Sequence, residues 1–181
     1  MFFEDLGRYP HRDGDDTFTD LTDGMRSVGF RPDYARLTVG WPAAGHRWTT
    51  GPAPAGFTDR LAAVLDAQQV NAVLGLHECA LCPTPLPDAH PWYTPRPGHL
   101  RASAGTGEIR VPGTPGTVFA APHLIGHYVA DHGYLPPRPF VEAVLAFDPY
   151  GPWPARFPGI RFPWIPDDAT LRHVDEDRPV V

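Results

Sequence analysis

The sequence contains no lysine, so all 15 residues of the Lys+Arg class are arginines. The formal net charge is −6, and the arginines form no basic stripe. Because binding to phosphate groups needs clustered positive charge, nucleic acid is not expected as a partner. The expected partner is therefore an unknown protein or a small molecule.

Long apolar runs are also missing. No stretch approaches the ~18 apolar residues that a membrane-spanning helix requires, so no association with a membrane is expected. The first residues, 1–5, have neither the positive charge nor the apolar stretch of a signal peptide. We therefore expect a cytoplasmic protein.

Cysteine is scarce, because only Cys79 and Cys82 are present, in a C-x-x-C spacing. In a reducing compartment, two cysteines do not form a disulfide framework. A redox pair of the thioredoxin type needs its first thiolate at a helix N-terminus, whereas three prolines within residues 83–87 prevent a regular helix here. The spacing thus favours a metal-binding knuckle over a redox pair and over two unconnected apolar residues.

Proline and glycine, in contrast, are abundant, with 24 and 18 residues, so much of the chain is expected in loops and turns. A chain of 181 residues is long enough for one domain with a hydrophobic core. We expect an irregular N-terminal extension over residues 1–33, a zinc-stabilised α+β domain over 34–147 and a C-terminal tail over 148–181. The tail is rich in proline and aromatic residues, and its aromatics predict that it packs on the domain.

The spacing of apolar residues predicts the elements of this domain. It indicates a helix over roughly 56–68, a second helix beginning near Ala121 and a third that opens at Pro139 and ends near Phe147. Strands are expected over 34–41, 46–50, 70–76, 100–103, 107–111 and 117–119. The predicted fold class is α+β, with a small, mainly antiparallel sheet packed against two or three helices and a zinc knuckle.

Several histidines are candidate partners for the two cysteines. His127 and His132 have the spacing H-x4-H, and zinc prefers four Cys and His ligands in pairs of this kind. His123 competes with His132 because it lies on the same helical face as His127, and His77 competes because it shares a strand face with Cys79. The candidate metal ligands are Cys79, Cys82, His127, His132 and His77, and the expected ion is Zn2+.

Two functions are compatible with such a site. A closed site with four protein ligands is typical of a zinc-stabilised binding or interaction module. A catalytic zinc keeps one position open beside a carboxylate, so the alternative is a small zinc-dependent enzyme, such as a biosynthetic tailoring enzyme, with metal-bound water near Glu78. The H-x-E…P-C-x-x-C pattern of deaminases and the H-E-x-x-H motif are both missing from the sequence. The binding module is therefore the first hypothesis, and no catalytic residue is assigned.

Several motifs resemble those of an uncharacterised bacterial family of small proteins. The two specific motifs are H-x-C-x-x-C from His77 and HYV-x-x-H-x-Y-x-PP from His127. Weaker matches are DL..Y from Asp5, L-x-VGW from Leu37, H-x-W-x-x-G from His46 and EIRV from Glu108. The matched positions cover most of residues 3–147.

All five candidate ligands occupy positions that belong to the family motifs, whereas His123 does not. The resemblance thus favours the pair His127 and His132 and keeps His77 as a candidate. Residues 1–33 and 148–181 depart from the short family form. Because the family has no assigned activity, the resemblance implies the metal site and leaves the function open.

Overall fold

The computed structural model describes residues 1–10, 14–19, 27–73, 77–82, 104–151 and 171–173. The strands in these ranges are β1 (Asp16–Thr19), β2 (Ser27–Pro32), β3 (Ala35–Thr38), β4 (Gln69–Val70), β5 (His77–Glu78), β6 (Ala104–Gly105), β7 (Glu108–Pro112), β8 (Thr117–Pro122) and β9 (Leu171–His173). The helices are α1 (Phe57–Ala67), α2 (Ile125–His132) and α3 (Arg138–Ala146).

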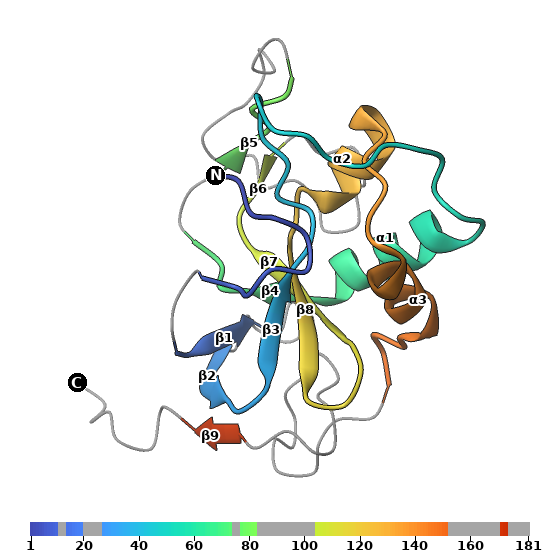
Figure 1. Cartoon of the computed structure of the whole chain (residues 1–181). Coiled ribbons are helices and arrows are strands. Elements are labelled where there is room, and N and C mark those ends of the chain that lie inside the picture. The colour runs from blue at the N-terminus through green and yellow to red at the C-terminus, as the bar shows by residue number, and fades with distance from the viewer. Residues whose placement is uncertain (11–13, 20–26, 74–76, 83–103, 152–170, 174–181) are drawn as a thin grey trace.

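Seven of the described strands form one sheet, in the order β3-β8-β7-β4-β1-β2-β9 (Figure 1). Strands β3 and β8 are parallel, and every other neighbouring pair is antiparallel. Strands β5 and β6 form a separate antiparallel pair. The predicted α+β class, with a mainly antiparallel sheet and three helices, is therefore confirmed.

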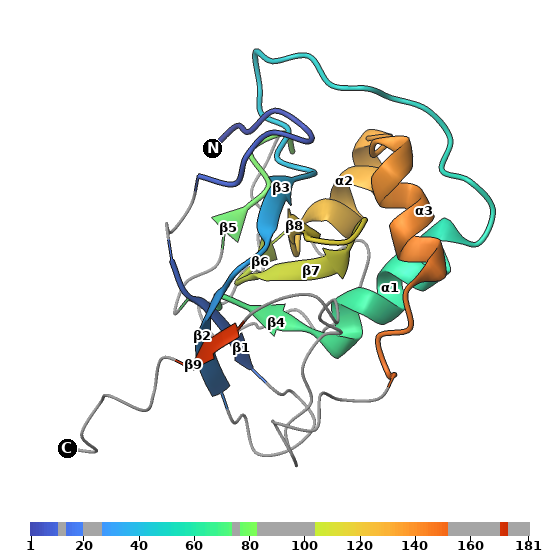
Figure 2. The ribbon, with the colours of Figure 1, turned by 60° about the horizontal axis from the view of Figure 1, so that its bottom comes forward.

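The three helices lie together on one side of the large sheet (Figure 2). Alternation along β7 explains this arrangement, because Ile109 and Val111 are fully buried in the apolar core that the helices share. The helices contribute Phe57, Leu61, Val64, Ile125, Phe140 and Val144 to this core. Within the described ranges, no helix has the length and hydrophobicity to cross a membrane.

The residue between these two, Arg110, belongs to a buried network of charges. Its Nε and Nη2 atoms donate hydrogen bonds to both carboxylate oxygens of Asp16, at 3.0 and 2.7 Å, and its Nη1 donates to Glu108 at 2.7 Å. The hydroxyl of Tyr9 donates to the same Glu108 carboxylate. Although burial alone would raise the pKa of Asp16, the guanidinium of Arg110 holds this pKa below its ordinary value. The network ties β1 and the N-terminal segment to β7.

The N-terminal segment is also anchored by Asp5, whose Oδ1 accepts hydrogen bonds from the backbone N–H of Gly40, at 3.0 Å, and from the hydroxyl of Tyr134, at 2.8 Å. Gly40 has a positive φ of 82°, and a Cβ placed there would lie 2.8 Å from Ile125. This position therefore requires glycine both for its backbone conformation and for the close packing of α2.

The start of α2 differs from the prediction. The second helix was expected near Ala121, but β8 pairs with β7 as far as Pro122, so these residues are used by the sheet and the helix begins at Ile125. The helix is capped at its C-terminus by Gly133, which has a φ of 62° and whose N–H donates to the carbonyl of Tyr128. The left-handed backbone of Gly133 thus stops the helix after His132.

Two predicted strands are shorter or missing. Residues 46–50 form no strand, and only Thr50 makes an isolated bridge, with Tyr134. The strand expected over 70–76 is reduced to the end of β4, because Asn71 takes a positive φ of 50° and exchanges hydrogen bonds with the backbone of Thr17. Residues 74–76 and the strand expected over 100–103 lie outside the described residues.

Both ends of the chain contribute strands that were not predicted. Residues 1–33 were expected to be irregular, yet residues 16–19 and 27–32 form β1 and β2 of the large sheet. The tail contributes β9, which pairs with β2. These strands lack a strong hydrophobic alternation, and their position depends on pairing with distant strands and on the partners of Asp16.

Candidate metal centre

The two cysteines follow directly after β5. This strand pairs with β6, with His77 opposite Gly105, which fixes the direction from which the chain enters the knuckle. The backbone N–H of Cys82 donates to the carbonyl of Cys79 at 3.4 Å, so the segment forms a tight turn that brings the thiols to one side. Cys79 is buried and Cys82 is half-buried.

The two histidines come from α2. His127 is the third residue of α2, and only 4% of it is exposed. His132 is the last residue of the helix. Five residues correspond to about 140° around an ideal helix, so the two side chains leave the helix in different directions. Their rings nevertheless converge, with Nε2 atoms 3.1 Å apart and ring centroids 4.8 Å apart. The early end of the helix at Gly133 leaves His132 at a terminus, where its ring can turn toward His127.

Cysteine sulfurs and histidine nitrogens meet at this point. The Sγ of Cys79 lies 3.3 Å from Nε2 of His132, and the Sγ of Cys82 lies 3.3 Å from Nε2 of His127 and 3.6 Å from Nε2 of His132. All four atoms lie within 4.8 Å of one another. With metal–sulfur bonds of about 2.3 Å and metal–nitrogen bonds of about 2.0 Å, a tetrahedron has S···N edges of about 3.6 Å and N···N edges of about 3.3 Å. The group can therefore hold a metal ion with little movement.

A carboxylate supports the histidine that is most deeply buried. Asp131 lies four residues after His127 on α2, and its Oδ2 atom is 2.9 Å from Nδ1 of His127. Histidine ligands commonly contact a carboxylate through the ring nitrogen that does not bind the metal. The pattern H-x3-D on a helix is visible in the sequence, but the sequence analysis did not select Asp131.

The electrostatics of the group favour a cation. Burial raises the pKa of the Cys82 thiol, and the hydrogen bond and negative charge of Cys79 and the charge of Asp131 raise it further. Burial together with the two thiols raises the pKa of Tyr128 to about 12. Negative charge in this region is therefore unfavourable without a counterion, and a divalent cation between the thiolates would supply one.

The other two candidate histidines lie outside this group. His77 is exposed on β5. His123 is hydrogen-bonded through Nε2 to the carbonyl oxygen of Gln68 at 2.9 Å, and burial lowers its pKa, so it is a neutral histidine of the protein interior. Of the five predicted ligands, the structure thus brings together Cys79, Cys82, His127 and His132, and it leaves His77 aside.

A cavity of about 200 Å³ adjoins the knuckle. His77, Glu78 and Ala80 line it from the knuckle side, and Leu124 and Tyr128 line it from the side of α2 and its first turn. Aromatic rings of the N-terminal half and the carboxylate of Glu108 complete the wall, to which no arginine contributes among the described residues. The segments that carry the cysteines and the histidines therefore form part of the wall of this cavity.

Comparison with known proteins gives a single match. A family model for a domain of unknown function, DUF7919, matches residues 1–145. These residues contain the cysteines, the histidines and nearly all of the elements, and the match ends before the C-terminal tail. No curated protein and no solved structure matches the chain.

Proposed function

Because the chain belongs to the DUF7919 family of domains of unknown function, we propose its function from its own residues: it is a zinc-stabilised binding module. The observation that carries this proposal is the convergence of two thiols and two imidazoles within 4.8 Å. Two sulfur and two nitrogen ligands at tetrahedral distances suit zinc, whereas magnesium and calcium prefer oxygen ligands. Four protein ligands also leave no open position, which is typical of structural zinc.

The role of the zinc follows from where its ligands lie in the chain. Cys82 and His127 are 45 residues apart, and among the described residues β5, which leads into the knuckle, pairs with the two residues of β6. A bound zinc would form two bonds to the cysteines of the knuckle and two bonds to the histidines of α2. It would thereby hold the two sides of the adjoining cavity at a fixed separation.

We assign the binding function to this cavity. Its volume of about 200 Å³ is small, so it suits a small ligand or a single side chain of a partner. Glu78 and Glu108 line it, and because Glu108 is paired with Arg110, the carboxylate that disfavours anionic ligands is that of Glu78. The proposal thus links the metal to function through the shape of the cavity and not through chemistry at the metal.

The proposal is tested by metal analysis of the purified chain together with X-ray absorption spectroscopy. We expect one zinc per chain with two sulfur and two nitrogen neighbours. We also expect Cys79→Ser to lose the metal and to lower the free energy of unfolding by about 4 kcal/mol or more, as for other lost metal sites. A chain that is purified without chelators and contains no metal would contradict the proposal.

One observation favours the second candidate, a small zinc-dependent enzyme. Glu78 lies next to Cys79 and lines the adjoining cavity, where a carboxylate could act on a metal-bound water. This candidate predicts an oxygen neighbour in place of one protein ligand, so the absorption spectrum should show one sulfur neighbour fewer or the outer-shell scattering of one imidazole ring fewer. It also predicts that Glu78→Gln keeps the metal and the stability but abolishes an activity. A spectrum with two sulfur neighbours and the scattering of two imidazole rings would exclude it.

A further inference from the structure

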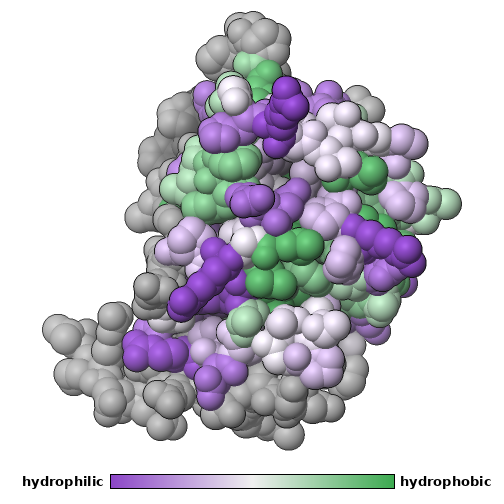
Figure 3. All heavy atoms as spheres, viewed as in Figure 1, coloured by the Kyte–Doolittle hydropathy of each residue, from purple (hydrophilic) through white to green (hydrophobic). Residues whose placement is uncertain are grey.

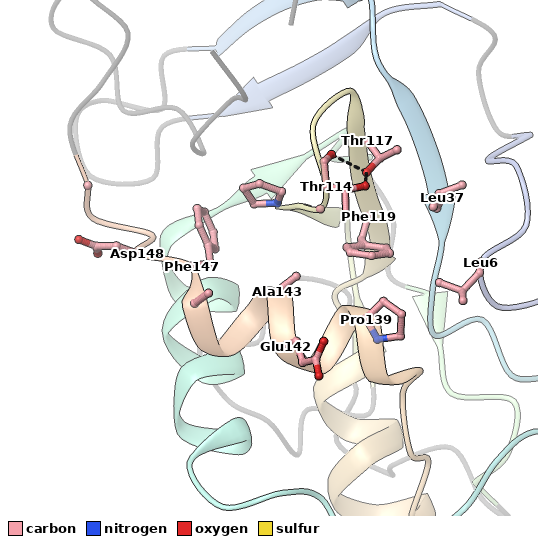
Figure 4. Close-up of a pocket in the computed structure, with 14 residues that line it drawn as sticks. Leu6, Leu37, Thr114, Thr117, Phe119, Pro139, Glu142, Ala143, Phe147 and Asp148 are labelled. Carbon is pink, nitrogen blue, oxygen red and sulfur yellow. Dashed lines mark hydrogen bonds between the residues drawn. The ribbon is translucent and has the colours of Figure 1, made fainter. Parts of the chain in front are cut away.

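A second, larger hollow lies away from the metal centre. It has a volume of about 710 Å³ and runs between α3 and the hairpin of β7 and β8 (Figure 4). Phe147, Ala143 and Pro139 face it from α3 and its end, and Phe119, Leu37 and Leu6 face it from the sheet and the N-terminal segment. It shares no lining residue with the metal centre or with the cavity beside the knuckle. We call it the α3 groove.

The α3 groove is lined mainly by apolar side chains. Its walls are mainly side chains of leucine, proline, alanine and phenylalanine, and its volume falls in the range of sites that bind sizeable ligands. Hydrophobic side chains also form a patch near the centre of the face shown in Figure 3, with hydrophilic side chains around it. An apolar occupant would remove these side chains from water, which is energetically favourable.

We propose that residues 152–170 of the same chain dock in the α3 groove. Residues 147, 148 and 151 all line the groove. Gly151 is the last residue of the described range 104–151, so residue 152 follows directly from the wall of the groove. The backbone there is turned, because the N–H of Gly151 donates to the carbonyl of Asp148 at 3.2 Å. The chain is described again at β9, on the edge of the large sheet, so both ends of residues 152–170 are held on this domain.

The composition of these residues matches the apolar walls. Residues 152–166 read PWPARFPGIRFPWIP and contain four aromatic side chains: Trp153, Phe157, Phe162 and Trp164. A fully extended chain of 19 residues spans roughly 60 Å, so it is long enough to enter the groove and still reach β9. Burying several aromatic side chains would also give this proline-rich segment the hydrophobic stabilisation that offsets the entropy of ordering it.

Charge gives a second argument for this occupant. The described lining of the groove contains two carboxylates, Glu142 and Asp148, and no arginine. Of residues 152–170, Arg156 and Arg161 are positively charged, and the two acidic residues, Asp167 and Asp168, follow them close to β9. Opposite charges at the rim of an apolar contact favour this pairing and its orientation. The family match ends at residue 145, so the proposed occupant lies outside the matched residues.

Limited trypsin digestion of the full, metal-loaded chain tests the proposal. The bonds after Arg156 and Arg161 are cleavage sites, and docking should protect them. We expect Ala143→Arg, which fills the groove, to accelerate cleavage at both sites at least about tenfold over wild type. The matched control is Leu145→Arg on the same helix, since Leu145 is 39% exposed and does not line the groove. This control should be cleaved like wild type, and equal rates for wild type and Ala143→Arg would overturn the proposal.

A photo-crosslink gives an answer that does not depend on how Ala143→Arg folds. Glu142 is exposed at the rim, with 60% of its side chain accessible, so a benzophenone amino acid is tolerated in its place. Irradiation of the full chain should produce an intramolecular crosslink to residues 152–166, mapped by mass spectrometry. A crosslink to a second copy of the chain, or none to residues 152–166, would overturn the proposal. Metal content in the same sample separates this outcome from a failure of the zinc site.

Discussion

Asp131 lies one helical turn beyond His127, and its Oδ2 atom is 2.9 Å from Nδ1 of that histidine. This contact favours the tautomer that carries its proton on Nδ1. In this tautomer Nε2 carries the lone pair that can bind a metal, and it is the atom that lies 3.3 Å from the sulfur of Cys82. Asp131 therefore acts as a positioning residue for His127.

We expect Asp131→Asn to weaken zinc binding by about 10- to 100-fold while the chain remains folded in excess zinc, because loss of a carboxylate that orients a histidine ligand has effects of this size. A competition titration with a chromophoric chelator measures the change. Glu142→Gln is the matched control, since Glu142 also contacts a residue four positions away, Arg138, but on α3 and in solvent. Unchanged affinity in Asp131→Asn would show that the contact does not orient the ligand.

The identity of the fourth ligand gives a second prediction. His132 lies within the group of four and His77 does not, although the sequence made them competitors. We expect His132→Ala to lower zinc affinity by several orders of magnitude, because it removes one bond from a closed site. His77→Ala should retain one zinc per chain and a wild-type absorption spectrum. A loss of zinc in His77→Ala alone, with His132→Ala unaffected, would reverse the assignment.

The site was more predictable from the sequence than its surroundings. The C-x-x-C spacing and the H-x4-H spacing are local patterns whose chemistry is restricted, so four of the five predicted ligands lie together. The choice between His132 and His77 depended on where α2 ends and on which face of β5 carries the side chain of His77. Both are set by contacts between residues that are distant in the sequence. His123 was separated from the site because its ring nitrogen is engaged by the carbonyl of Gln68, a contact between residues 55 positions apart.

The fold was predicted where hydrophobic periodicity is strong. Helices α1 and α3 lie where the apolar spacing placed them, and the hairpin of β7 and β8 has the predicted turn. Strands β1 and β2 were missed because their residues carry no clear alternation, and the acidic residue in β1, Asp16, looks like a solvent-exposed group. Its burial becomes possible through Arg110, Arg36 and Asn71, which lie 94, 20 and 55 residues away and which local sequence does not reveal.

The pKa of Cys82 leads to a prediction on pH. Burial and the neighbouring Cys79 and Asp131 raise this pKa above its usual range, so in the metal-free chain Cys82 is protonated at neutral pH. Zinc binds the thiolate, so binding must release this proton and the affinity must rise with pH until the raised pKa is reached. We expect the affinity to increase at least about tenfold per pH unit between pH 6 and 8. Titration calorimetry in buffers of different ionisation enthalpy should detect the released protons, and an affinity independent of pH would contradict this reasoning.

The buried network around Arg110 leads to a prediction on stability. Arg110 is 1% exposed and pairs with Asp16, which is fully buried, and with Glu108. We expect Arg110→Met to lower the free energy of unfolding at pH 7 by about 3–5 kcal/mol, because Glu108 loses its ion pair with Arg110 and the buried Asp16 is left with the ion pair to Arg36 at 3.0 Å. Urea unfolding followed by circular dichroism measures this loss.

The pH dependence of that loss identifies its cause. In wild type the pKa of Asp16 is lowered, so its contribution to stability is present above the unfolded-state pKa of about 3.9 and disappears as the pH falls through the lower folded-state value. In Arg110→Met, Asp16 loses its larger charge partner and keeps Arg36, so burial should raise its pKa relative to wild type. Protonation then relieves the buried charge, and the difference from wild type should shrink between pH 7 and pH 4. Arg31→Met is the control, because the ion pair of Arg31 with Asp15 leaves 59% of the arginine side chain exposed and should change stability by less than about 1 kcal/mol at either pH. A loss in Arg110→Met that is independent of pH would point to lost packing of the arginine side chain and not to the carboxylates that lose their ion pair with Arg110.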